Sequence, residues 1–235
     1  MDIFNQRKKD IFSKQDKSSK GEVDKKISSL CNKINEKDNY YTTSSCAGRV
    51  VLIVDKNKKE KRVFRFVSHE LINFEELKKE LISLIQPATS PTTTPDLSRS
   101  QSSRGLKNIV NNKTKNDLNG ISDKIKKSAI KLSNLNIKFK QEPCIIHVAC
   151  RTLKDAQKFL ILAQRAGWKR SGIIASGTNG RFIVEAISTE KLEFPIIINE
   201  KIIVDDNFLK IIVEKANENL KKSWKKIESL EKSIK

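Results

Sequence analysis

Apolar residues recur at helical spacing in the first third of the chain and then gather in short continuous runs. Helices are predicted where the spacing repeats every three or four positions, and a buried strand where aliphatic residues follow one another. The stretches that fit before Pro87 are helices at 1–15, 23–34 and 74–85 and strands at 50–54 and 62–67. Asn73, with Glu76 three residues on, has the spacing of a capping box and marks the start of the third helix.

The same two patterns return after residue 136. Strands are expected at 137–140, 144–150, 171–175, 182–187, 195–198 and 201–204, and helices at 153–166 and 206–233. The last helix carries one apolar stripe, and its distal end is expected to be exposed and coated with lysine. Hairpins mixed with crossover helices favour an α+β fold, in which a mixed β-sheet packs with helices and a long C-terminal helix. A doubly wound, Rossmann-type array is not indicated.

The composition changes between these two halves. From Pro87 to about residue 120 the chain is rich in Pro, Ser and Thr and poor in apolar residues. This predicts a disordered, low-complexity insertion at 87–120, because such a segment cannot bury enough apolar surface to fold. A short helix is expected at 121–133. The rest of the chain, from 1 to 235, is expected to form a single domain.

The chain is strongly basic, with 47 Lys and Arg against 28 Asp and Glu and a formal net charge of +19. Such an excess favours an anionic partner, and nucleic acid before a membrane surface. Residues 86–140 carry 11 basic and 3 acidic residues, so part of the excess belongs to a stretch that water alone could solvate. No run approaches the roughly 20 apolar residues of a spanning helix, and the N-terminus is not signal-like, so no membrane contact and a cytoplasmic location are expected.

One stretch, from Tyr40 to Arg49, combines an aromatic pair, a run of hydroxyls, a thiol, a glycine and an arginine. It is expected to form a polar turn held at the start of the 50–54 strand. Gly48 allows close approach of a ligand, and the planar guanidinium of Arg49 suits a carboxylate or a phosphate. A hydroxyl-rich turn without any ligand explains the same residues.

Both histidines lie in strand-end contexts, His69 beside Ser68 and His147 within an apolar run. An ordinary hydrogen-bonded interior histidine explains His147, and an ordinary strand-end residue explains His69. Zinc ligation by Cys46, His69, His147 and Cys150 is permitted by residue type, but the spacing matches no standard ligand pair, so no metal is expected.

Common catalytic motifs are absent from the sequence. There is no G-x-S-x-G elbow, so a Ser-His-Asp hydrolase is poorly supported. There is no P-loop, and no G-x-G-x-x-G follows a strand, so an ordinary nucleotide or methyl-donor site is not indicated.

Several short strings occur in one order along the chain. They are Ser13–Ser18 with Lys20–Asp24, Tyr41–Arg49 before its aliphatic strand, Ser68–His69, Glu142–Pro143, His147–Arg151, Asp155–Gln157, Ala166–Trp168 and Ser171–Ile173. Together they resemble the tRNA wybutosine-synthesizing protein 3 family, over nearly the whole chain apart from the stretch at about 86–135.

The resemblance implies an S-adenosylmethionine-dependent methyltransferase that acts late in wybutosine synthesis. Its substrate would be the N4 ring nitrogen of the modified guanosine next to the anticodon of tRNA-Phe, and other enzymes of that pathway are possible partners. Methyl transfer is a displacement at carbon, so the protein has mainly to align donor and nucleophile and exclude water. A base is needed if the ring nitrogen carries a proton.

The resemblance also suggests site residues. The catalytic candidates are Asp16, Ser45, His69 and His147, and the candidates for binding substrate or cofactor are Lys17, Ser18, Ser44, Cys46, Gly48, Arg49, Ser68, Cys150 and Arg151. Arg49 or Arg151 suits the carboxylates of the donor and of the modified base. Cys46 is not expected to act as a nucleophile.

Two other readings fit the sequence. A non-catalytic module that holds modified tRNA would explain the missing donor motif, and it would show no binding of S-adenosylmethionine. A scaffold with a solvated basic surface would bind tRNA only at low salt.

Overall fold

The computed structural model describes residues 2–13, 24–55, 63–85, 135–177 and 180–234. Its helices are α1 (Ile3–Phe12), α2 (Lys25–Asn35), α3 (Phe74–Ile85), α5 (Leu153–Arg165) and α6 (Asp206–Ser233). Its strands are β1 (Tyr40–Cys46), β2 (Arg49–Val54), β3 (Phe64–Ser68), β4 (Ile137–Glu142), β5 (Ile145–Cys150), β6 (Gly172–Ala175), β7 (Phe182–Ile187), β8 (Leu192–Ile198) and β9 (Lys201–Ile202). The predicted insertion and the predicted helix at 121–133 lie outside the described residues.

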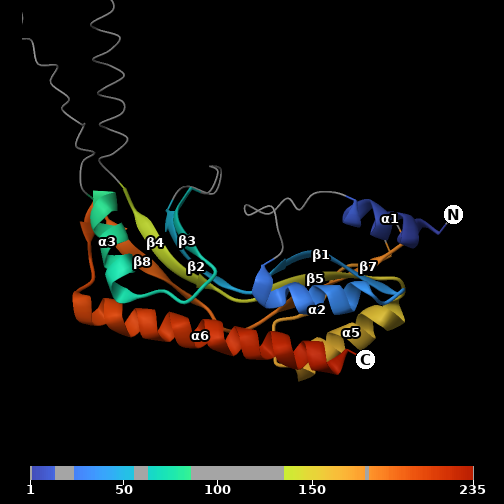
Figure 1. Ribbon diagram of the computed structural model, residues 1–235. Helices are drawn as coiled ribbons and strands as arrows, with labels where there is room; N and C mark the ends of the chain where they lie inside the picture. The colour runs from blue at the N-terminus through green and yellow to red at the C-terminus, as the bar shows by residue number, and fades with distance from the viewer. Residues whose placement is uncertain (1, 14–23, 56–62, 86–134, 178–179, 235) are drawn as a thin grey trace, which may run out of the picture.

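The strands form two sheets, ordered β1-β5-β7-β6 and β3-β2-β4-β8-β9. Every pairing between the described strands is antiparallel, so two antiparallel sheets take the place of the expected mixed sheet. The α+β class and the long C-terminal helix are confirmed. Helices α2, α3, α5 and α6 cover one face of the strands, while α1 lies on the other face (Figure 1).

Two strands continue from one sheet into the other at the same place. β1 passes into β2 through Ala47 and Gly48, and β4 passes into β5 through Pro143 and Cys144. The last pair on one side is Cys46 with Ile145, and the first on the other is Arg49 with Glu142. We call this crossing, residues 46–49 and 142–145, the bend.

The expected polar turn at Tyr40–Arg49 is wrong for most of its length, because Tyr40–Cys46 is strand β1 and the turn is confined to Ala47 and Gly48. Tyr and Thr favour strands, and β1 is an edge strand with one open face, so its hydroxyls remain satisfied by water and neighbours.

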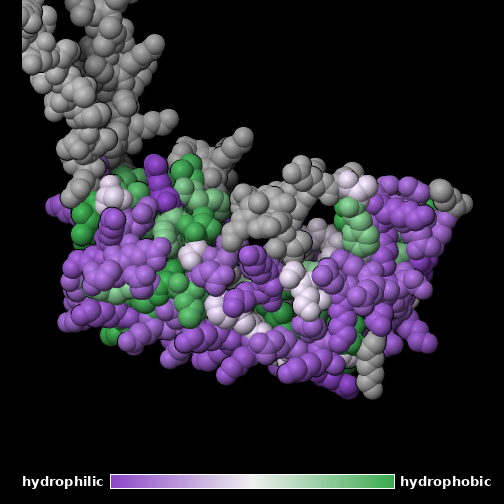
Figure 2. Space-filling model, in the orientation of Figure 1, coloured by the Kyte–Doolittle hydropathy of each residue, from purple (hydrophilic) through white to green (hydrophobic). Residues whose placement is uncertain are grey.

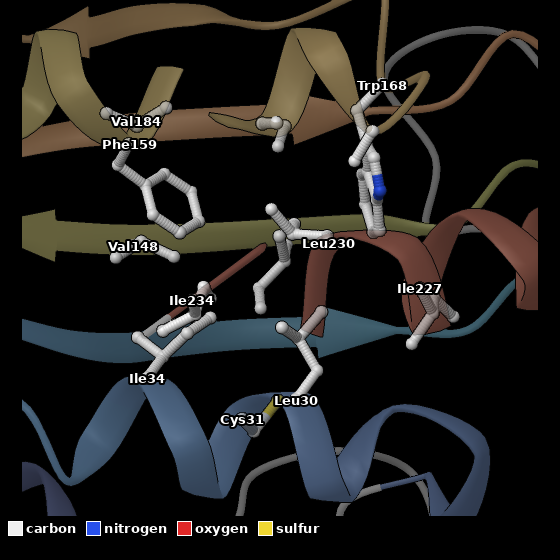
Figure 3. Packing of buried hydrophobic residues seen from close by; sticks show 14 of the residues in the cluster. Leu30, Cys31, Ile34, Val148, Phe159, Trp168, Val184, Ile227, Leu230 and Ile234 are labelled. Carbon is white, nitrogen blue, oxygen red and sulfur yellow. The ribbon is translucent and has the colours of Figure 1, made fainter. Parts of the chain in front are cut away.

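One core fills the space between the first sheet and its helices. Leu30 of α2, Phe159 of α5 and Leu230 of α6 converge on Val148 of β5, and all are almost wholly buried (Figure 3). The second sheet packs on α3 and on the first half of α6, which contributes the buried residues Leu209, Ile212, Val213, Ala216 and Leu220. One helix therefore belongs to both cores.

The distal end of α6 is not exposed as expected. Ile227, Leu230 and Ile234 are buried in the first core, and Lys33 donates a hydrogen bond to the Glu231 carbonyl. Lys221, Lys222, Lys225 and Lys232 are exposed, whereas Lys226 is half-buried and pairs with Glu190. Hydrophilic residues follow the outer side of the helix (Figure 2). The apolar stripe thus continues to the last turn, and the helix docks along its full length.

Helix α1 covers part of the opposite face of the first sheet. Phe4 packs against Tyr41 with a ring separation of 4.9 Å and contacts Ala149 beside it. We call this side of the strands, away from α2, α5 and α6, the open face. Between α1 and the bend, the open face carries polar side chains. In the described part of the chain, no helix has both the length and the apolar content needed to cross a membrane.

Candidate active site

The backbone at the bend is tightly constrained. Gly48 has φ of +96°, and a Cβ there would lie 3.1 Å from the Glu142 carbonyl oxygen and 3.2 Å from Cδ2 of Leu220. A side chain would therefore be strained both by the dihedral and by the close approach of β4 and α6. Gly48 brings the ends of β1 and β2 together, so the side chains on either side of it share one neighbourhood.

A β-bulge decides which hydroxyl of β1 faces the open side. The register shifts between Thr42 and Ser44, so that Ser44 pairs with His147 and Ser45 pairs with Ile146. Simple alternation would have placed Ser45 on the open face, since a slip of one residue turns every following side chain over. Instead Ser45 points toward α2, where Cys31 Sγ lies 3.4 Å from its Oγ.

Three side chains form a hydrogen-bonded row across neighbouring strands of the open face. Ser44 Oγ lies 2.6 Å from His147 Nδ1, and His147 Nε2 lies 2.8 Å from Glu185 Oε2. The register explains the row, because His147 of β5 is the partner of Ser44 in β1 and of Glu185 in β7. His147 and Glu185 are 23% and 30% exposed, so the row is open to a ligand.

A second cluster lies two residues further along β1, about 7 Å from the first by strand geometry. His69 Nδ1 lies 3.0 Å from Asp24 Oδ2 and 3.9 Å from Cys46 Sγ. Asp24 is also the N-cap of α2 and accepts hydrogen bonds from the Lys26 and Ala47 amides. One carboxylate therefore ties together α2, the bend and the end of β3.

The ion pair between Asp24 and His69 shifts both groups. Hydrogen bonds from His69 to Asp24 and Cys46 raise the pKa of His69 to about 9, against a smaller opposing effect of burial. Burial disfavours the charge of Asp24, but the hydrogen bonds from His69, Lys26 and Ala47 together hold its pKa below the usual value. At neutral pH the pair is an imidazolium with a carboxylate.

Arg49 lies on the far side of the bend and is held from two directions. Its Nε donates to Glu142 Oε2 at 2.6 Å, and its guanidinium lies 5.1 Å from the centre of the Phe64 ring. Arg49 is 23% exposed. Glu142 engages Nε, so in our proposal the terminal nitrogens of the planar fork are the donors for a bound carboxylate.

The structure brings together only some of the predicted site residues. Ser44, Cys46, Gly48, Arg49, His69 and His147 lie at the bend or in the row beside it. Asp16, Lys17 and Ser18 lie outside the described residues, and their roles stay predictions.

Four other predicted residues lie elsewhere. Ser45 and Cys150 face the helices, and burial raises the pKa of the Cys150 thiol to about 12. Arg151 bonds to Asp2, to Asn5 Oδ1 and to the Asp38 carbonyl near α1. Ser68 Oγ donates to the Glu70 carbonyl, which makes a local turn after β3.

The zinc set weighed from sequence is not assembled, since Cys150 faces the core and His147 is engaged by Glu185. Among the described residues, Asp24, Cys46 and His69 place one ligand-type atom each within 4.8 Å of one another. The contacts that the structure shows between them are the Asp24–His69 ion pair and the neighbouring thiol of Cys46.

Three residues of the candidate site received no role from the sequence: Asp24, Glu142 and Glu185, although the strings Lys20–Asp24 and Glu142–Pro143 contain the first two. Two of them left a signal, because Glu185 is a lone charge inside the apolar strand Phe182–Ile187 and Asp24 stands at a helix start. Their partners are 38 to 93 residues away along the chain, so only the folded structure shows the pairing.

Structural comparison places this architecture outside the Rossmann fold. The chain superposes on the PH1069 protein from Pyrococcus horikoshii with a TM-score of 0.71 and 26% identity, covering 99% of this chain and 96% of that one. A hypothetical protein from Aeropyrum pernix shares the fold, with a TM-score of 0.62 and 20% identity over 90% and 96% of the two chains.

Sequence comparison is equally broad. A protein of Methanocaldococcus jannaschii named tRNA(Phe) 7-((3-amino-3-carboxypropyl)-4-demethylwyosine(37)-N(4))-methyltransferase is 30% identical over 95% of this chain and 92% of its own length. A tRNA wybutosine-synthesizing protein 3 homolog from Danio rerio is 28% identical over 97% of this chain and 72% of its own length.

Two curled antiparallel sheets joined at the bend, an architecture shared with the superposed archaeal proteins, thus define a fold class distinct from the Rossmann fold. Residues 6–235 match the family described as Methyltransferase TYW3. The chain belongs to that family and is a methyltransferase, which confirms the resemblance found from its sequence.

Proposed function

We propose that this enzyme transfers the methyl group of S-adenosylmethionine to N4 of 7-(3-amino-3-carboxypropyl)-4-demethylwyosine next to the anticodon of tRNA-Phe. The archaeal relative whose name states this reaction aligns with nearly the whole chain and supports the proposal. The observation that carries it is the meeting of the Ser44 row, the Asp24–His69 pair and Arg49 at one bend. Because the substrate is a tRNA, we further propose that the enzyme acts in the cytoplasm.

The groups at the bend fit the proposed donor by their chemistry. S-adenosylmethionine carries a carboxylate, an ammonium and a sulfonium, and when bound it supplies a methyl group activated by the positive sulfur. Arg49 can take a carboxylate through its terminal nitrogens, and the carboxylates of Glu142 and Glu185 favour cationic groups nearby. The bend and the row beside it offer both positively and negatively charged side chains, which a glycine-rich phosphate loop does not.

The modified base brings a second carboxylate, on its aminocarboxypropyl side chain. Arg49 is the arginine that the described residues place at the bend, and Arg151 is occupied near α1. We therefore assign to Arg49 the recognition of one of these two carboxylates, and to Arg151 neither. We assign contact with the reacting nitrogen to the hydroxyl of Ser44 and the ring of His147, because that row is exposed beside the bend.

The proposal is tested by a methylation assay. Purified enzyme is mixed with labelled S-adenosylmethionine and with tRNA-Phe from cells blocked at this step, and the anticodon-loop nucleoside is analysed by mass. A gain of one methyl group on the modified guanosine, absent from an unmodified transcript, is expected. Tight tRNA binding without methyl transfer, and without calorimetric binding of S-adenosylmethionine, would instead indicate a tRNA-holding module.

The role of Arg49 is tested in the same assay. Arg49→Ala is expected to slow single-turnover methylation by at least about tenfold, because a charge-assisted bidentate contact to a carboxylate is lost. Arg165→Ala is the matched control, since Arg165 is exposed in the last turn of α5. Full activity of a folded Arg49→Ala protein would remove Arg49 from the site.

A further inference from the structure

The directions of the hydrogen bonds in the row of Ser44, His147 and Glu185 follow from the carboxylate at its end. A carboxylate oxygen accepts, so His147 donates from Nε2 to Glu185 Oε2 at 2.8 Å. In the neutral ring Nδ1 is then an acceptor, and it accepts a hydrogen bond from the Ser44 hydroxyl, with 2.6 Å between the oxygen and the nitrogen. The remaining lone pairs of the Ser44 oxygen are left for a ligand, because Ser44 is exposed.

Methyl transfer to a ring nitrogen that carries a proton requires a proton acceptor. The N–C bond forms as the C–S bond breaks, and the C–S electron pair neutralises the sulfonium. The nitrogen keeps the electron pair of its N–H bond only if the proton leaves. Some group of the enzyme must take that proton if the product is not to carry a positive charge.

We propose that Ser44, His147 and Glu185 form a proton relay that accepts this proton, an inference that rests on the proposed methylation. The ring nitrogen gives its proton to the Ser44 oxygen while the Ser44 hydroxyl proton passes to His147 Nδ1. Glu185 is a positioning residue: it fixes the tautomer and stabilises the imidazolium that forms. No bond forms between Ser44 and the substrate.

The other histidine is poorly suited to this task. His69 bonds through Nδ1 to Asp24 and is already protonated at neutral pH, since its pKa is raised to about 9 by Asp24 and Cys46. A cation cannot accept a further proton. Among the described residues, the charged group that contacts His147 is Glu185. The next titratable groups are Cys46, two residues further along β1, and the Asp24–His69 pair beside it.

The relay is tested by single-turnover methylation as a function of pH. The wild-type rate is expected to rise with pH, because the relay has to accept a proton. Glu185→Gln removes the negative charge that stabilises the imidazolium, so the midpoint of this rise should move to lower pH and the plateau should fall about tenfold or more. His147→Ala should abolish the rise and lower the rate about 100-fold. Affinity for tRNA should change little in either variant.

The matched control is Glu193→Gln. Glu193 is 30% exposed like Glu185 and pairs with Lys140 in the second sheet. Its variant should keep the wild-type pH profile. A purely structural role for Glu185 would lower stability or raise KM without moving the midpoint.

A second readout does not need turnover. The chain has two histidines, so ¹⁵N-histidine NMR gives two ring systems, and His69→Asn assigns them. The relay requires the Nε2-protonated tautomer of neutral His147, and the Nδ1-protonated tautomer would overturn it. An unchanged pH profile in Glu185→Gln would overturn the relay while leaving the methylation standing, and absence of transfer by the wild type would overturn both.

Discussion

Cys46 lies at the centre of the site, yet its geometry is that of a neighbour and not of a nucleophile. Its Sγ is 3.9 Å from His69 Nδ1, and that nitrogen is shared with Asp24. The expectation that Cys46 is not a nucleophile stays a prediction, in which the thiol fills space and adds a weak hydrogen bond.

We predict that Cys46→Ser keeps single-turnover methylation within about threefold, because a hydroxyl preserves a weak polar contact at that position. The rate is measured beside that of Cys31→Ser, whose thiol lies on the helix side of β1. A folded but inactive Cys46→Ser protein would show that sulfur chemistry is part of the reaction.

The Asp24–His69 pair gives the protein a specific dependence on pH. The pKa of His69 is raised from 6.5 to about 9 on folding, so its contribution to stability is complete below pH 6.5 and is lost as pH rises through 9. The pKa of Asp24 is lowered from 3.8, so its contribution is present above pH 3.8 and is lost as pH falls below that value.

We predict that His69→Asn lowers the free energy of unfolding by about 2 kcal/mol between pH 4 and 6.5. Chemical denaturation of both proteins at several pH values measures the difference. The difference should shrink steadily up to pH 9 and above. A difference that grows with pH in that range would contradict the assigned ion pair.

At the scale of elements, β1 shows what the sequence could and could not predict. Spacing and capping signals placed α3 at Phe74–Ile85 and α6 at Asp206–Ser233, because amphipathic helices record their buried face locally. The residue order of β1 does not show its buried face, because that face depends on the strand with which β1 pairs. Its bulge between Thr42 and Ser44 is set by pairing with β5, about 100 residues later, and left no local signal.

The candidate site divides in the same way. Ser44, Arg49, His69 and His147 were found because hydroxyls, guanidinium and imidazole are rare beside apolar strands. The partners that orient them, Asp24, Glu142 and Glu185, were not, since acidic residues are common and their use depends on register.

The bend itself can be tested at Gly48. We predict that Gly48→Ala destabilises the protein by about 2 kcal/mol and reduces methylation, because φ of +96° and a carbonyl oxygen at 3.1 Å both oppose a Cβ. Thermal or urea denaturation gives the first effect, and single-turnover rates give the second.

Two other glycines separate the effect of the positive φ from the effect of close packing around a Cβ. Gly177 has φ of +69° with nothing within 4 Å of a Cβ, and Gly172 has neither restriction. Gly177→Ala should cost about 1 kcal/mol and Gly172→Ala should be close to neutral. Equal effects at Gly48 and Gly177 would mean that the close packing at the bend contributes nothing.

At the scale of the whole molecule, the candidate site is assembled from elements that lie on either side of residues 87–120 in the sequence. The two sheets, α6 and the bend are all built from the described residues on either side of that stretch. The net charge of +19 is shared between this stretch and the rest of the chain.

We predict that deletion of residues 90–118 leaves the methylation rate within about threefold at saturating tRNA, while tRNA affinity weakens mainly at low salt, where non-specific phosphate contacts count most. Rates and filter binding at two salt concentrations measure both effects. Loss of all activity in a folded deletion protein would place part of the site in that stretch.

Helix α6 contributes to both cores, from Leu209 under one sheet to Leu230 under the other. The angle at which the two sheets meet is therefore fixed by a single rigid rod of 28 residues. We do not expect the two sheets to close around the substrate by a hinge motion. We expect the adaptation to fall on the tRNA, whose modified nucleotide must leave its stack and itself become the cover that keeps water from the reacting atoms.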